Sequence, residues 1–228
     1  MIPRYKVKEI SDIWSTKNKL DTWLKVELAH LSSLTGNIIN RTITEEDLQT
    51  IKDNVKIDVD RWKEIEKETK HDLQAFVQML EESVPGDAGR WIHYGLTSSD
   101  ILDTSLTIMC RDSIKVIKFY LSDLLYNMYA LLKKDFANKK ILSRTHGKSA
   151  EIQTYYEVFT RWIAQLQRGY DELTRLKTSI TFGKLSGPSG NYTTNEKQNE
   201  YDALSSLDLK PVKSSQIISR DIYLDYFY

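Results

Sequence analysis

Apolar residues recur at helical spacing along most of the chain. The stretch from 16 to 34 carries them on one helical face, and Ser15 or Thr16 precedes it where an N-cap belongs. Thr44 begins another helix, because acidic residues follow it and favour a helix N-terminus. The stripes consist of Leu20, Trp23, Leu24, Leu28, Leu31 and Leu34; of Val59, Trp62 and Ile65; and of Leu73, Phe76, Val77 and Leu80.

Two longer helices are predicted in the second half, over about 100–134 and about 151–179. Both are apolar on broad faces, which indicates burial by neighbours: either other subunits or further chain completes a bundle. The glycine-rich segment 183–190 follows them and is expected to be a turn between helices, and no strand is expected. We therefore predict an all-α fold with a helical domain over 1–110 and the first part of a long-helix domain over 111–228.

Composition excludes several classes of protein. The 32 Lys and Arg residues balance 32 Asp and Glu residues, which argues against general nucleic-acid binding. No apolar run approaches the ~20 residues of a membrane-spanning helix, and no signal peptide is visible. Cys110 is the single cysteine, so no disulfide can form within the chain, and no Cys/His spacing typical of a metal site occurs. These features indicate a cytoplasmic protein without a membrane partner.

Four histidines are candidates for chemistry. His30 lies within an amphipathic helix, where packing is the ordinary role. His71 stands between Lys70 and Asp72, so Asp72 could fix its tautomer, or the three residues form a charged helix end.

His93 and His146 lie in polar stretches. His93 comes shortly before Thr97, Ser98, Ser99 and Asp100 at the start of the long helix, an arrangement that either binds an anion or simply caps the helix. His146 lies between Arg144 and Lys148 in a connector, where it could act as a general acid beside an anionic substrate or be part of a polar loop.

Taken together, these segments resemble the adenylosuccinate lyase family of the fumarase/aspartase superfamily, in order and in approximate spacing over the whole chain. Thr-Ser-Ser-Asp and Arg-Thr-His-Gly are specific in combination, whereas either alone is weak. The matching segments are Arg4-Tyr5, Lys70-His71-Asp72, His93-Tyr94-Gly95-Leu96-Thr97-Ser98-Ser99-Asp100, Arg144-Thr145-His146-Gly147, Gly183-Lys184-Leu185-Ser186-Gly187 and Ser214-Ser215-Gln216-Ile217-Ile218-Ser219-Arg220-Asp221.

The resemblance implies an all-helical homotetramer that eliminates fumarate from adenylosuccinate, giving AMP, and from the succinylcarboxamide ribonucleotide of purine synthesis. It implies no metal and no organic cofactor, and active sites that draw on three chains. It assigns His146 as the general acid and His71 as a second catalytic residue. The substrate-binding residues that it implies are Arg4, Tyr5, Lys70, His71, Asp72, His93, Thr97, Ser98, Gln216 and Arg220.

Two departures from the family pattern matter. The family usually has arginine where Lys70 stands, so the charge remains but the bidentate fork is lost. The catalytic serine loop, Ser-Ser-x-Met-Pro-x-Lys-x-Asn, does not occur, so the chain resembles an N-terminal half and is expected to be nearly inactive alone. The alternatives are another lyase of the superfamily, such as argininosuccinate lyase, or a non-catalytic helical assembly protein.

Overall fold

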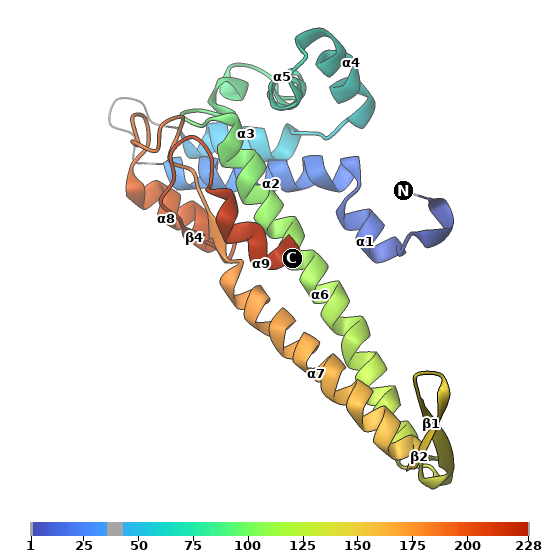
Figure 1. The fold of residues 1–228 in the computed structure, drawn as a ribbon. Helices are drawn as coiled ribbons and strands as arrows, with labels where there is room; N and C mark the ends of the chain where they lie inside the picture. Colours follow the sequence, from blue (N-terminus) through green and yellow to red (C-terminus); the bar gives the residue numbers. More distant parts are fainter. Residues whose placement is uncertain (1, 36–42, 228) are drawn as a thin grey trace. The chain divides into compact units, whose positions relative to one another are not determined.

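A computed structural model describes residues 2–35 and 43–227, and its fold is mostly helical, as predicted (Figure 1). Its contacts divide the chain into two compact units. Unit 1 comprises the chain up to Asp112 and from Ile180 onward, and unit 2 comprises Ser113–Ser179. The expected domains, 1–110 and 111–228, stay a prediction.

Two helices near the start of unit 1, α2 and α3, are capped as the sequence predicts. The Ser15 hydroxyl accepts the N–H of Asn18, and the Thr44 hydroxyl accepts the N–H of Asp47, so each satisfies a donor that the helix leaves unpaired. The elements are η1 (Pro3–Tyr5), α1 (Lys8–Ile13), α2 (Thr16–Leu34) and α3 (Glu45–Asn54).

The next helices close the core of unit 1 over the apolar face of α2. Phe76 of α5 meets Trp23 of α2 edge to face, with ring centroids 5.3 Å apart. Both side chains are buried, and the predicted stripes are either buried with them or partly buried against the same core, so the helical spacing identified the core correctly. These elements are α4 (Val59–Thr69), α5 (Asp72–Ser83) and η2 (Ala88–Trp91).

The long helix α6 (Ser98–Leu132) contributes its first turns to unit 1, where Ile101 and Ile108 are buried. The chain returns to unit 1 after residue 179, and α8 packs along α2. Two-residue strands pair in parallel, with Phe182 opposite Lys210. The elements are β3 (Phe182–Gly183), α8 (Lys197–Ser206), β4 (Lys210–Pro211), η4 (Arg220–Tyr223) and α9 (Leu224–Phe227).

Unit 2 consists of the rest of α6, a β-hairpin and α7, with a small core around Leu125, Met128 and Ile163. The sequence predicts no strand, and this prediction is wrong in unit 2. The connector before α7, which was expected to be a loop, forms an antiparallel β-hairpin. Most side chains of the hairpin are exposed on both faces, so the sequence shows no alternation of apolar residues that would predict its strands. The elements are η3 (Asp135–Asn138), β1 (Lys140–Thr145), β2 (Lys148–Thr154) and α7 (Tyr155–Ser179).

None of the helices in the described part of the chain is both long enough and apolar enough to span a bilayer.

Candidate functional site

The N-terminal ends of α5 and α6 border a small cavity of about 180 Å³ in unit 1. His71, His93 and Ser98 line it, so it brings together residues for which the family resemblance implies substrate binding. The N-terminus of a helix is the positive end of the helix dipole, which favours a nearby negative charge. The cavity therefore suits an anionic group. Its other lining residues are Leu73, Gln74 and Val77.

His71 is the N-cap of α5, and its ring is oriented by the backbone. Its Nδ1 accepts the N–H of Gln74 at 3.2 Å, so the neutral ring carries its proton on Nε2. The nearest carboxylate oxygen of Asp72 is 3.9 Å from Nδ1 and accepts the N–H of Leu73 instead. The sequence suggested that Asp72 could fix the tautomer of His71. In the structure, the backbone N–H of Gln74 at the helix N-terminus fixes it instead.

His93 is held by a buried carboxylate on α2. The Oε1 atom of Glu27 lies 2.6 Å from Nδ1 of His93, and Oε2 accepts the backbone N–H of His93 at 3.2 Å. Glu27 is 0% exposed, and His93 has a φ of 63°, a conformation that few non-glycine residues adopt. Sequence reasoning missed Glu27. The signal was a carboxylate one helical turn from both Trp23 and Leu31, on the apolar face.

His30 packs in the protein interior, which is the ordinary role expected for a histidine within an amphipathic helix. It is 0% exposed, and its Nε2 lies 3.0 Å from the carbonyl oxygen of Tyr94. A carbonyl only accepts, so Nε2 donates, and among the described residues the buried Nδ1 has no hydrogen-bond partner. Burial lowers the pKa of His30, which keeps it neutral near pH 7.

The first turn of α6 is fixed by Asp100, whose side chain is 0% exposed. Its carboxylate accepts the N–H of Thr97 at 2.8 Å and that of Gly187 at 3.1 Å, and it forms an ion pair with the equally buried Lys184. Asp100 thus caps α6 and also ties it to the glycine-rich segment. Thr97 and Ser98 are placed by this buried contact.

The segment 183–190, expected to be a simple turn, is largely buried and hydrogen-bonded. Glu200 of α8 accepts the N–H of Leu185 at 2.7 Å and the hydroxyl of Tyr192 at 2.6 Å. Burial raises the pKa of Glu200 and, together with the Glu200 carboxylate, raises that of Tyr192. These residues form a buried polar network with Asp100 and Lys184, and sequence reasoning did not detect it.

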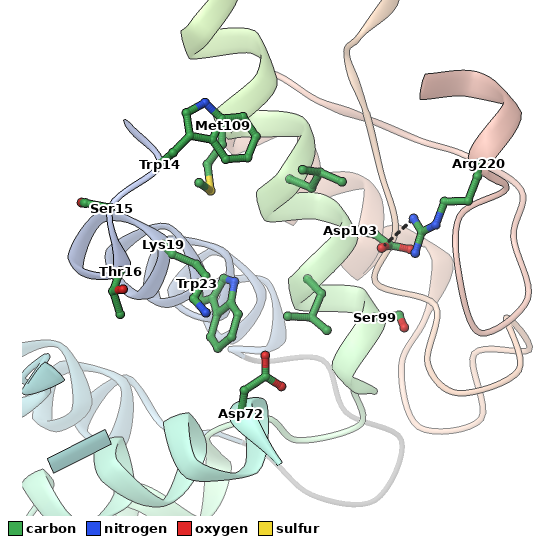
Figure 2. A pocket seen from close by; sticks show the side chains of 12 residues that line it. Trp14, Ser15, Thr16, Lys19, Trp23, Asp72, Ser99, Asp103, Met109 and Arg220 are labelled. Atoms are coloured by element: carbon green, nitrogen blue, oxygen red, sulfur yellow. Dashed lines mark hydrogen bonds and ion pairs between the residues drawn. The ribbon is translucent and has the colours of Figure 1, made fainter. Parts of the chain in front are cut away.

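A larger cavity of about 460 Å³ in unit 1 is lined by Asp72, Ser99 and Arg220 (Figure 2). Figure 2 shows Arg220 reaching Asp103, and their closest atoms are 2.8 Å apart. Asp103 also accepts the N–H of Ile218 at 2.8 Å, so it anchors the segment that leads into η4. The other lining residues are Trp14, Ser15, Thr16, Lys19, Trp23, Leu102, Leu106 and Met109.

The remaining predicted residues of unit 1 lie outside these two cavities. The guanidinium of Arg4 donates to the Tyr5 hydroxyl at 3.0 Å and lies 4.9 Å from the ring centroid. Lys70 ends α4 with a φ of 56°, and Gln216 is exposed in the segment before η4.

His146 belongs to unit 2, at the turn of the β1–β2 hairpin. It has a φ of 50° and Gly147 a φ of 74°, which is the backbone of a two-residue hairpin turn with both central residues left-handed. Its side chain is exposed, and within the described residues of unit 2 no group hydrogen-bonds the imidazole. Arg144 and Lys148 flank the turn and are exposed as well. The hairpin therefore presents a histidine and two cations outward.

No cluster of three or more His, Cys, Asp or Glu side chains positioned to bind a metal ion exists among residues 2–35 and 43–227.

Comparison with known proteins places the chain in a family. A family model described as "Lyase" matches residues 4–227. The chain belongs to this lyase family. It is 34% identical to an adenylosuccinate lyase of Staphylococcus saprophyticus and 38% identical to one of Synechocystis sp., over 99% of the chain and 52% of each relative. The chain thus spans about half the length of these curated relatives.

Solved structures share the fold at lower identity. A fumarate lyase from Mesorhizobium sp. matches with a TM-score of 0.82 and 18% identity, over 93% of this chain and 51% of that one. A β-carboxy-cis,cis-muconate cycloisomerase from Acinetobacter calcoaceticus matches with a TM-score of 0.83 and 20% identity, over 96% and 53%. These likenesses establish the fold alone.

Proposed function

We propose that the chain forms part of an adenylosuccinate lyase. The reaction is a β-elimination that cleaves a C–N bond: adenylosuccinate gives AMP and fumarate, and the succinylcarboxamide ribonucleotide gives the carboxamide and fumarate. The main support is the similarity to adenylosuccinate lyases along nearly the whole chain. The cavity between two helix N-termini supports it independently, because the substrate is a polyanion.

The proposed roles follow the chemistry of the groups. In the elimination, a base takes a proton from the succinyl carbon next to the C–N carbon, the electron pair forms the double bond of fumarate, and nitrogen leaves with the C–N electrons. His146 gives that nitrogen its proton, and fixed donors stabilise the carboxylate that gains charge. His71 is the second catalytic residue. The substrate-binding residues are Arg4, Tyr5, Lys70, His71, Asp72, His93, Thr97, Ser98, Gln216 and Arg220.

We assign no base within this chain, because the serine-loop pattern does not occur in its 228 residues. We further propose that copies of the chain assemble, as a homotetramer in the complete enzyme, so that His146 of one copy serves the cavity of another. Exposed apolar side chains in unit 2 support association. They include Phe119, Leu124, Tyr126, Tyr129 and Trp162, which are 45–74% exposed. A cytoplasmic location, with no nucleic-acid partner, stays a prediction from composition.

Ligand-dependent thermal unfolding tests the substrate. A ligand that binds only the folded state raises the melting temperature, so adenylosuccinate should raise it and argininosuccinate should not. Ser98→Ala should reduce the shift, because it removes a hydroxyl from the cavity, while Ser32→Ala on the exposed side of α2 should not.

A shift with argininosuccinate alone would instead indicate the related lyase. The absence of any shift would favour a non-catalytic assembly protein.

A further inference from the structure

We propose that Glu27 is a positioning residue: it fixes the ring of His93 so that Nε2 is the nitrogen offered to the 180 Å³ cavity, where an oxyanion of the ligand binds. The proposal rests on the function proposed above. It assigns a role to a residue of α2 that lines neither cavity described here.

Glu27 is buried and binds His93 through both of its carboxylate oxygens. Its side chain is 1% exposed, and both oxygens accept from His93, one from Nδ1 at 2.6 Å and one from the backbone N–H at 3.2 Å. A buried carboxylate is costly unless it is paired, so a residue of this kind on an apolar helix face calls for a partner. The two bonds fix both the ring and the backbone at a position where φ is 63°.

The cavity therefore receives two histidines in opposite tautomers. His71 accepts through Nδ1 and carries its proton on Nε2, whereas His93 donates through Nδ1 and leaves the Nε2 lone pair open. Among the described residues, neither Nε2 forms a hydrogen bond. The pair offers one N–H donor and one nitrogen that can take up a proton beside an anion. A phosphate or carboxylate group fits this arrangement, together with the Ser98 side chain.

The tautomers can be read directly. The chain is labelled with 15N-histidine, and long-range 15N–1H correlation spectra are recorded at a pH where the rings are neutral, with assignments from single His→Asn variants. We expect the His93 proton on Nδ1 and the His71 proton on Nε2. A His93 proton on Nε2 in the unaltered chain would overturn the proposal, whether or not any variant folds.

Glu27→Gln is the variant that removes the cause. Its amide cannot accept from both His93 donors, so His93 should lose its single tautomer while His71, set by the N–H of Gln74, keeps its own. Glu81→Gln is the matched control, because the Glu81 carboxyl interacts with His93 only through its charge. An unchanged His93 tautomer in a folded Glu27→Gln chain would contradict the proposal.

Inorganic phosphate and fumarate then test the ligand class in separate titrations. The anion that occupies the cavity should shift the Nε2 signals of both rings, and Glu27→Gln should weaken its binding about tenfold, the effect of one charge-assisted hydrogen bond. A response to phosphate alone identifies a phosphate site, and a response to fumarate alone a carboxylate site. No response to either would refute the oxyanion assignment. The tautomer result needs no ligand, so it stands apart from failure of the chain to bind adenylosuccinate.

Discussion

The first turn of α6 and the β1–β2 hairpin both carry candidate site residues, but they are held in opposite ways. Thr97 and Ser98 are held in place by the buried Asp100, which binds Lys184 and two backbone N–H groups. His146 sits on an exposed turn whose strands bury almost nothing. The structure of unit 1 alone orders the first group, whereas within unit 2 nothing orders the imidazole of His146.

This contrast bears on how such a site reaches its working geometry. Groups that stabilise developing charge act best when they are already oriented, and buried hydrogen bonds provide that in unit 1. An exposed imidazole on a two-residue turn can be oriented only by contacts beyond its own hairpin. The proposed assembly of copies would supply them.

The largest expected difference between the two regions comes from the buried ion pair. Lys184→Met leaves the Asp100 carboxylate buried without its cation, which should lower the free energy of unfolding by about 3–5 kcal/mol. Urea denaturation measures it. Lys213→Met, at an exposed lysine, is the control and should change stability by less than about 0.5 kcal/mol. A loss below about 1 kcal/mol for Lys184→Met would show that the network is not what holds α6.

Two glycines, one in each region, have nearly the same backbone conformation but different surroundings. Gly95 has a φ of 75° and Gly147 a φ of 74°, so alanine is strained at both. A Cβ at Gly95 would also clash with the Thr194 hydroxyl oxygen, whereas at Gly147 no described atom lies within 4 Å. Gly147→Ala should cost about 1 kcal/mol of strain and Gly95→Ala a further 1–3 kcal/mol from crowding. Equal losses in denaturation would mean that the loop at Gly95 yields freely.

Stability should also depend on pH through His30. Its folded pKa lies below the ordinary 6.5, so the unfolded chain binds more protons in that window and stability falls as pH drops below 6.5. Burial is the main cause. The hydrogen bond to the Tyr94 carbonyl opposes this lowering of the pKa, as do the nearby charges of Glu27 and Asp100, whereas a charge on His93 adds to it. His30→Asn should flatten the slope of unfolding free energy against pH, and an unchanged slope would assign it to other groups.

The sequence predicted the helices well because each apolar stripe faces the core of its own unit. The predicted stretch of about 100–134 corresponds to α6, and Ser15 and Thr44 cap as expected. The second long helix, expected from about 151, starts at Tyr155 because β2 occupies the preceding residues. A hairpin without a buried face gives no alternating pattern to detect.

The partners of the candidate site residues were harder to predict, because they are distant in sequence. Asp100 pairs with Lys184, and His93 with Glu27, across three different segments of the chain. A lysine in a segment rich in glycine and serine, such as Lys184, is typical of an exposed loop, and nothing in the neighbouring sequence shows that it is buried. Local motifs thus identified the groups but not what orients them.

The smallest expected change in stability is that of a substitution at His146, compared with the same substitution at His93. His93 and His146 both have positive φ, 63° and 50°, and asparagine tolerates that conformation better than most residues. His93→Asn should cost about 1–3 kcal/mol, because the buried Glu27 loses the Nδ1 donor. His146→Asn creates Asn-Gly, the sequence that such hairpin turns favour, so the free energy of unfolding should change by less than about 0.5 kcal/mol. Urea denaturation, with hydrogen exchange followed separately in each unit, measures both. A loss above about 1 kcal/mol at His146 would show that the imidazole is already held within this chain, and the proposal that neighbouring copies orient it would lose its main physical argument.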